Sequence, residues 1–346
     1  MTGRDLLLVR CTSTSPYTGR CSLPLIMKSS IRIGVIGVGH LGQHHARIYA
    51  NMDGVRLVGV CDQDAERGRK IAEERGVPYF PTSKALLSLV DAVSVAVPTS
   101  SHFEVVSTCL RQGCHVLVEK PITTHVSEGE ELVELAKSMG KVLHVGHVER
   151  FNPIVEVVRP LIHRPGFIEC HRLSPFQPRG TDVDVVRDLM IHDLDLLLSL
   201  GLGRIQEIDA RGLPVLTDFP DVANVRMVFE EGCVATLTAS RISTGRLRKI
   251  RIFQPERYIS VDFGSKEATV TTRKKVQGGG ADVQSQLVKA KDGDALTREL
   301  TCFVQTIKKN EMVFGVTGEE GVEALRVAST VGLLIQQHME PGQDYV

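Results

Sequence analysis

The chain has 346 residues, and its 41 basic and 41 acidic side chains cancel to a formal net charge of zero. We therefore expect no nucleic-acid partner, because proteins that bind nucleic acids usually carry a basic excess. The sequence has no run of about 18 apolar residues, so we expect no membrane-spanning helix and no membrane partner. Hydrophobic residues make up 42% of the chain, which excludes general disorder. The length predicts two domains.

Residues 1–30 differ in composition from the rest of the chain. They are rich in serine, threonine and arginine and contain one acidic residue, Asp5. The apolar run Leu6–Val9 is too short for the core of a signal peptide. We expect a disordered extension, or a start codon assigned upstream of Met27, with an organelle transit peptide as the alternative.

The eight cysteines are scattered, and no two of them form a C-x-x-C pair. A chain of this length does not need disulfides for stability, and several of the cysteines lie in apolar segments. We interpret them as reduced residues of a cytoplasmic protein. Because metal-ligand spacing is missing, no metal site is predicted.

A glycine-rich turn follows the first apolar run, Ile31–Ile36, and matches the pattern G-x-G-x-x-G. Its first glycine allows a tight turn, its second lets the backbone approach a pyrophosphate, and its third lets the following helix pack on the strand. The helix start then presents free N–H groups to the phosphates. The expected cofactor contacts in this turn are Gly37, Gly39, His40, Leu41 and Gly42.

An acidic residue stands at the end of the second apolar run, Val55–Val60. Asp62 lies twenty residues beyond Gly42 and would accept hydrogen bonds from the adenosine ribose hydroxyls. The same carboxylate would repel a 2′-phosphate, although Arg67 is near enough in sequence to reach one. We expect NAD as the cofactor, with NADP less favoured. The structural alternative is a tight strand–helix turn with a solvated acid.

Strands and helices continue to alternate as far as residue 150, which predicts a parallel sheet covered on both faces. The expected elements are helices at 64–75, 103–111 and 126–137, the last capped by Ser127, and strands at 92–97, 115–118 and 141–145. Ligands bind at the carboxyl ends of such strands. We therefore expect Thr99, His102, Glu119 and Lys120 to face one crevice, with a helix-capping role as the alternative for His102.

The second half, residues 151–346, has a different pattern that predicts an α+β domain with an open, mostly antiparallel sheet. Short turns join several of its strands and demand antiparallel neighbours. The expected strands are 205–210, 222–229, 233–238, 247–253, 258–263 and 268–272. Residues 277–294 are expected to be a flexible loop. One face of the open sheet would be left exposed, and a second subunit could bury it, so we expect a homodimer or homotetramer.

Three helices are expected in this half. The first spans about 184–200, and the second carries the apolar face of Leu296 and Ile307. The last begins near Thr317, which forms a capping box with Glu320, and runs to about Gln337. We expect this last helix to pack back on the first domain.

Three polar segments are candidates for catalysis. Lys120 ends a parallel strand, with a surface lysine as the alternative. Arg150 and Asn152 lie in Gly146–Pro153 and suit a polar or anionic ligand, with an interdomain linker as the alternative. In the third segment Asp188, His192 and Asp195 share one helical face. The alternative is the wet side of an amphipathic helix with a His–carboxylate ion pair.

Taken together, Val95–His102, Glu119-Lys120-Pro121 and Asp188-x-x-x-His192-x-x-Asp195 resemble the Gfo/Idh/MocA oxidoreductase family. The resemblance extends over roughly residues 31–340. It implies an NAD(P)-binding Rossmann domain followed by an α/β domain with an open sheet. Within the family, Gly146–Pro153 and Asp184–Leu200 are most similar to UDP-sugar 3-dehydrogenases.

The resemblance implies oxidation of the C3 hydroxyl of a UDP-sugar, UDP-N-acetylglucosamine above all, in the route to a 3-amino sugar of lipid A. His192 would be the general base, because imidazole titrates near neutral pH. Asp188 would orient the imidazole or stabilise its protonated form, and Lys120 would stabilise the developing negative charge on the substrate oxygen. Arg150 and Arg179 would bind a diphosphate or a carboxylate. The alternatives are an enzyme for myo-inositol, a free hexose or a UDP-uronic acid, and a ligand-sensing regulator without catalysis.

Overall fold

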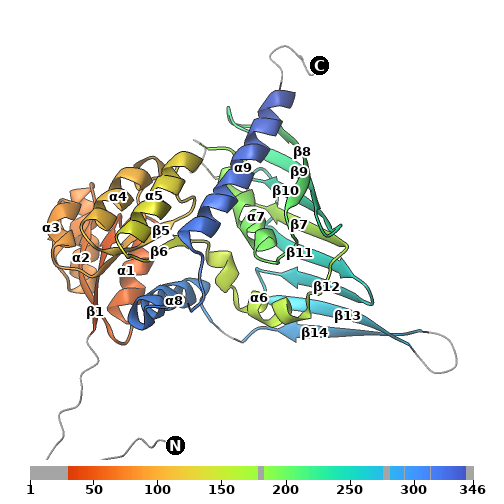
Figure 1. Cartoon of the computed structure of the whole chain (residues 1–346), viewed down its shortest axis with the longest axis horizontal. Coiled ribbons are helices and arrows are strands. Elements are labelled where there is room, and N and C mark those ends of the chain that lie inside the picture. Colours follow the sequence, from red (N-terminus) through yellow and green to blue (C-terminus); the bar gives the residue numbers. More distant parts are fainter. Residues whose placement is uncertain (1–29, 178–182, 276–280, 292, 312, 340–346) are drawn as a thin grey trace, which may run out of the picture.

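The computed structural model describes residues 30–177, 183–275, 281–291, 293–311 and 313–339. Two β-sheets stand apart in Figure 1, with helices layered on both faces of the smaller sheet and on one face of the larger. The expected Arg179 contact lies outside the described residues. No helix in these ranges is long and apolar enough to cross a membrane.

The first sheet is parallel throughout, and its strand order is β3-β2-β1-β4-β5-β6. This is the order of a Rossmann fold, in which ligands bind where the order reverses, here between β1 and β4. The predicted first-domain fold is therefore confirmed. Its strands are β1 Ile31–Ile36, β2 Val55–Cys61, β3 Tyr79–Phe80, β4 Ala92–Val95, β5 His115–Glu119 and β6 Leu143–Gly146.

The helices of this half connect successive strands. They are α1 Gly42–Ala50, α2 Ala65–Arg75, α3 Ser83–Leu87, α4 His102–Arg111 and α5 Val126–Ser138. The predicted cap of α5 is wrong by two residues. His125 rather than Ser127 precedes the helix, and the Glu128 carboxylate accepts from the His125 N–H at 3.2 Å. The spacing of a capping box is the same in both registers, so the sequence pattern alone did not distinguish them.

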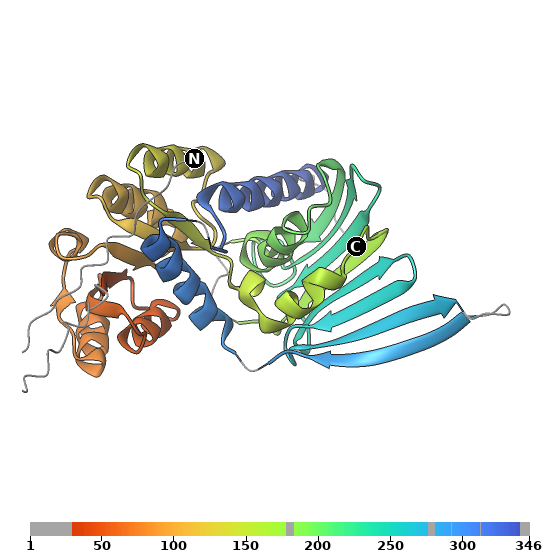
Figure 2. The ribbon, with the colours of Figure 1, turned by 60° about the horizontal axis from the view of Figure 1, so that its bottom comes forward.

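The second sheet has the order β14-β13-β12-β11-β7-β10-β9-β8, and only β7 and β10 run parallel. The predicted open, mostly antiparallel sheet is thus confirmed. Figure 2 shows α6, α7 and α9 over one face and, in the described part of the chain, no helix over the other. Its strands are β7 Phe167–Leu173, β8 Ile205–Leu213, β9 Val222–Phe229, β10 Val234–Ser240, β11 Leu247–Gln254, β12 Arg257–Asp262, β13 Glu267–Lys275 and β14 Ala281–Lys289.

Two of these strands were not predicted. β14 occupies much of the segment expected to be a flexible loop, 277–294, so that expectation is wrong for 281–289. Val283 and Leu287 on this edge strand are 63% and 56% exposed. β14 therefore lacks the buried apolar face that makes a strand predictable from sequence. β7 is central, and its buried positions alternate at Ile168, Cys170 and Arg172. Because the third of these is charged, the apolar alternation is too short to predict a strand.

The helices of the second half are α6 Pro153–Val158, α7 Ile191–Leu198, α8 Ala295–Lys309 and α9 Gly318–His338, with a π-helical turn, Val186–Met190, leading into α7. Although α8 follows the second sheet in sequence, its residues Leu300 and Phe303 belong to the core of the first sheet. α9 contacts α5 and β6 as well as α7 and β8. The predicted capping box of α9 is confirmed, with Thr317 and Glu320 bonded at 3.0 and 3.2 Å.

Candidate active site

The glycine-rich turn has the geometry of a cofactor cradle. Gly37 has a φ of +83°, and a Cβ on Gly42 would lie 1.8 Å from the Gly37 carbonyl oxygen. A Cβ on Gly39 would meet no atom within 4 Å, so the backbone here faces open space. The turn therefore fits a pyrophosphate, because it needs glycine at two positions for its own packing and leaves the third open to a ligand.

Asp62 ties this turn to the end of β2. Its carboxylate accepts from the Val38 N–H at 2.7 Å and from Arg67 Nη2 at 2.6 Å. Burial alone would raise the pKa of Asp62, but Arg67 and the backbone N–H groups hold it below its ordinary value. The carboxylate therefore stays charged beside the cradle, but Arg67 pairs with both of its oxygens and offsets much of the charge that would repel a phosphate on the adenosine ribose.

Two other residues expected to contact the cofactor, Glu119 and His102, have partners within the protein. The Glu119 carboxylate is buried and lies 3.1 Å from Nε2 of His45 on α1. The His102 ring is 1% exposed and lies within 3.0 Å of the carbonyl oxygens of Val97 and Pro121. Both side chains thus brace the strand ends rather than face a ligand, which corrects the expected contacts. Thr99 lies in a 3₁₀ turn after β4 and is partly exposed.

Lys120 and Asp188 meet across the two lobes. The Lys120 Nζ donates to the Asp188 backbone carbonyl at 2.6 Å and lies 3.6 Å from a carboxylate oxygen of the same residue. Asp188 lies in the π-helical turn that precedes α7. Such turns are rare and occur often at functional sites. The crevice of the first sheet and the start of α7 therefore form one site.

His192 lies in the first turn of α7 beside this pair. Its Nδ1 is buried and has no hydrogen-bond partner among the described residues. Burial, together with the positive charges of Lys120 and Arg172, holds the pKa of His192 well below 6.5. The ring is therefore neutral at physiological pH, which is the state that a proton acceptor needs.

These groups open into a cleft of about 540 Å³ between the lobes. His40 and Leu41 of the glycine-rich turn line it together with Asp188 and His192. The structure thus brings together the predicted cofactor turn and the predicted catalytic groups. The cleft wall also includes residues that the sequence analysis missed, namely Arg172, Ser174, Gln177, Arg241, Arg246 and Arg248.

Arg150 does not belong to this wall. Its guanidinium is 5% exposed and binds both Asp195 oxygens at 2.7 and 2.8 Å, as well as Glu320 at 2.6 Å. These partners satisfy the charge within the protein, so the expected substrate contact is corrected to a buried ion pair. The structure places Asp195 in this ion pair and not in the cleft with Asp188 and His192.

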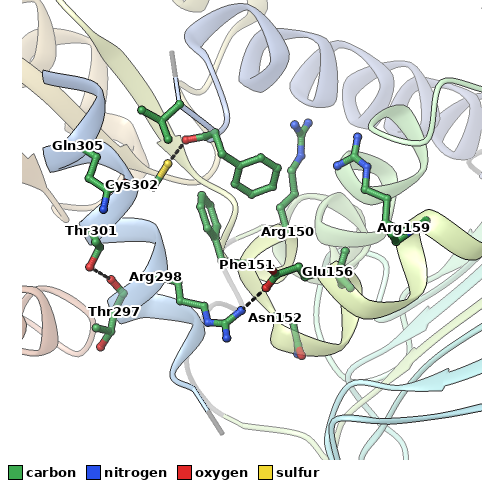
Figure 3. Close-up of a pocket in the computed structure, with 14 residues that line it drawn as sticks. Arg150, Phe151, Asn152, Glu156, Arg159, Thr297, Arg298, Thr301, Cys302 and Gln305 are labelled. Atoms are coloured by element: carbon green, nitrogen blue, oxygen red, sulfur yellow. Dashed lines mark hydrogen bonds and ion pairs between the residues drawn. The ribbon is translucent and has the colours of Figure 1, made fainter. Parts of the chain in front are cut away.

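Asn152 caps α6 by accepting from the Ile154 N–H at 3.3 Å. Both Arg150 and Asn152 border a second hollow of about 570 Å³ between α6 and α8 (Figure 3). This hollow is lined by Phe151 and Phe314, and neither Asp188 nor His192 lies in its wall. The expectation that Asn152 binds substrate therefore does not agree with its position.

Comparisons with known proteins agree with this geometry. Residues 31–147 match the oxidoreductase family model described as the NAD-binding Rossmann fold of GFO/IDH/MocA. Residues 169–259 match the GFO/IDH/MocA C-terminal domain. Together these matches cover the first sheet and the part of the second sheet from β7 to the start of β12, including the helical turn with Asp188 and the start of α7 with His192.

The chain is 39% identical over 316 residues to UDP-N-acetylglucosamine 3-dehydrogenase of Acidithiobacillus ferrooxidans, covering 89% of this chain and 99% of that one. A solved structure of that enzyme superposes with a TM-score of 0.85 at 38% identity, over 90% of this chain and 99% of the other. Myo-inositol 2-dehydrogenase of Thermotoga maritima is 27% identical over 85% of this chain and 93% of that one. The chain therefore belongs to the GFO/IDH/MocA family and is an NAD(P)-dependent oxidoreductase acting on CH–OH groups.

Proposed function

We propose that the protein oxidises the C3 hydroxyl of UDP-N-acetylglucosamine to a ketone with NAD as the hydride acceptor. The observation that carries the proposal is that Asp188 and His192 line one cleft with the glycine-rich turn, while the Lys120 ammonium is hydrogen-bonded to Asp188 at the cleft wall. The choice of sugar rests on similarity to a UDP-N-acetylglucosamine 3-dehydrogenase over nearly the whole chain.

His192 accepts the hydroxyl proton in this mechanism. A neutral imidazole beside two cations is a weak base for its type, but positioned proton transfer is typically worth about 10²–10⁴-fold. When bound in the glycine-rich cradle, NAD would supply the hydride acceptor for the carbon that bears this hydroxyl. Lys120 keeps N–H groups beyond the one given to Asp188 and donates to the substrate oxygen as negative charge develops there.

Asp188 acts on this reaction through Lys120. Its backbone carbonyl and carboxylate fix the ammonium beside α7. Burial lowers the pKa of Lys120, while the charges of Asp188 and Glu119 oppose that effect. Asp188 therefore helps to keep the lysine protonated, which it must be in order to donate to the substrate.

We further propose that the enzyme acts in the cytoplasm, supplying a ketone to which an aminotransferase adds nitrogen for a lipid A sugar. The proposed assembly is a homodimer or homotetramer formed through the helix-free sheet face. Phe167, Phe253 and Tyr258 cluster there, with ring centroids 5.7 and 4.9 Å apart. Such an apolar cluster on an uncovered sheet favours burial against a second subunit.

The test of the function is a substrate panel with purified protein and NAD, monitored at the NADH absorbance band. The panel includes UDP-N-acetylglucosamine, other UDP-sugars, a UDP-uronic acid, free hexoses and myo-inositol. We expect UDP-N-acetylglucosamine to give a kcat/KM at least about ten-fold above every other compound, and the isolated product to carry its ketone at C3. A higher kcat/KM for myo-inositol contradicts the proposal, and NADH formation with none of the panel favours the regulator.

A further inference from the structure

Four arginines line the cleft on the side of the second sheet. Arg172 lies in β7 and Arg248 in β11, and the two face each other directly across the antiparallel pairing of these strands. Arg241 follows the end of β10, and Arg246 lies in the turn before β11. Like charges opposite each other on a sheet are destabilising unless other groups offset them. Which of these arginines has a carboxylate partner therefore determines where the cleft keeps positive charge for a ligand.

Two of these arginines are neutralised by buried carboxylates. Arg172 binds Asp193 at 2.8 Å and Glu149 at 3.0 Å, and Arg241 binds Asp221 at 2.8 Å. Their charges are therefore satisfied inside the protein. They contribute to the shape of the wall, not to a surplus of positive charge.

The positive charges of the remaining two arginines, Arg246 and Arg248, are not fully offset by carboxylates. Arg248 lies 3.3 Å from the same Glu149 oxygen that binds Arg172, and its side chain is 46% exposed. One carboxylate oxygen thus serves two guanidinium groups. Arg246 is exposed and has no ion pair or hydrogen bond in the part of the chain that the structure describes. The cleft therefore carries a surplus of positive charge at Arg246 and Arg248.

We propose that Arg246, together with Arg248, binds the diphosphate of the nucleotide sugar. This inference rests on the proposed function, because the cleft must then hold both the sugar beside His192 and the diphosphate attached to it. Arginine is suited to this task, since its planar guanidinium donates two parallel hydrogen bonds to phosphate oxygens. An uncharged cyclitol has no group for this surplus charge, so the pair selects nucleotide-linked substrates.

The experiment compares the NAD-loaded wild-type enzyme with Arg246→Gln, Arg246→Lys and a matched control, Arg204→Gln. Arg204 is 88% exposed on a loop away from the cleft, so its removal changes the net charge equally. The Kd of UDP is measured by calorimetry, and KM and kcat are measured with UDP-N-acetylglucosamine. We expect Arg246→Gln to raise both Kd and KM by about ten- to a hundred-fold, with kcat within about three-fold of wild type. The Kd and KM of Arg246→Lys should lie between those of the wild-type enzyme and those of Arg246→Gln.

The outcomes separate this site from the proposed function. An unchanged Kd for UDP in Arg246→Gln, or an equal effect in Arg204→Gln, overturns the diphosphate site and leaves the function standing. Free glucuronic acid is titrated in parallel; if Arg246→Gln weakens its binding and leaves the Kd of UDP unchanged, Arg246 binds a carboxylate and the diphosphate site is overturned. If UDP binding depends on Arg246 but a different UDP-sugar is the one oxidised, the site stands and the proposed substrate is wrong.

Discussion

The Nζ of Lys120 donates to the backbone carbonyl of Asp188 over 2.6 Å, so the end of β5 is joined to the π-helical turn that leads into α7 and its candidate base His192. The bond joins the two lobes and holds the Lys120 side chain in one rotamer. Without it, the entropic cost of ordering this side chain would be incurred when the substrate binds. A donor held in place beforehand stabilises a developing charge without reorganising in the reaction. The arrangement therefore orders the site before the substrate arrives.

The variant Lys120→Met tests this role. Removing one preorganised donor from a developing oxyanion typically costs about 10²–10³-fold, so we expect kcat/KM to fall by that amount. NAD affinity should stay within about three-fold of wild type, because the cradle residues Gly37, Gly39 and Gly42 are untouched. Steady-state kinetics and NAD titration measure the two effects. The control is Lys84→Met, on the exposed surface of α3, and an equal loss of NAD affinity in Lys120→Met would assign the lysine to the cofactor.

The pH dependence of the reaction should report His192. Because its pKa lies well below 6.5, the ring stays neutral as pH falls through that value. The acid limb of kcat/KM should therefore lie on the acid side of pH 6.5, with activity lost as the ring becomes protonated. His192→Ala should lower kcat by about 10²–10⁴-fold and abolish the limb.

The cause of that lowered pKa is separately testable by NMR titration of His192. Burial, then Lys120 and then Arg172, disfavour the imidazolium, with smaller contributions from His147 and Arg248. Removing the ammonium in Lys120→Met takes away a repulsive charge, so the pKa of His192 should rise toward its ordinary value. A pKa that stays the same or falls would mean that the lysine does not act electrostatically on the ring.

Arg150 should be needed for stability and not for substrate binding. Asp195 is fully buried, and Arg150→Met leaves its charge without the bidentate partner. Breaking a buried pair in this way typically costs about 3–5 kcal/mol. We expect a loss of that size in the free energy of unfolding in urea. The double variant Arg150→Met with Asp195→Leu should recover part of it, because no buried charge is then left over. A large rise in KM at unchanged stability would return Arg150 to the substrate site.

The contrast between Lys120 and Arg150 shows which parts of the site could be predicted from the sequence. The glycine-rich turn, Asp62 and Lys120 stand at strand ends, so the alternation of strands and helices placed them at one edge of the sheet. Arg150 pairs with residues 45 and 170 positions away, and no local pattern indicates which of many carboxylates a cation meets. The arginine wall likewise depends on the pairing of β7 with β11, a long-range register that the sequence did not reveal.

The last prediction concerns the buried carboxyl group of Glu299 on α8. Its side chain is 2% exposed, and neither carboxyl oxygen has a hydrogen-bond partner among the described residues. Burial, with the negative charges of Glu119 and Asp195, raises its pKa well above 4.5. In the unfolded chain the carboxyl is ionised above about 4.5, so folding must take up a proton. The cost of that uptake grows with pH until the folded-state pKa is reached.

Glu299→Gln removes this cost, so it should stabilise the protein at pH 7 and have little effect near pH 4. Between about pH 5 and the folded-state pKa, the advantage of the variant should widen by about 1.4 kcal/mol per pH unit. Urea unfolding at a series of pH values measures the difference, and Glu73→Gln on the exposed surface of α2 is the control. A difference independent of pH would show that Glu299 is ionised in the folded protein and has a compensating partner.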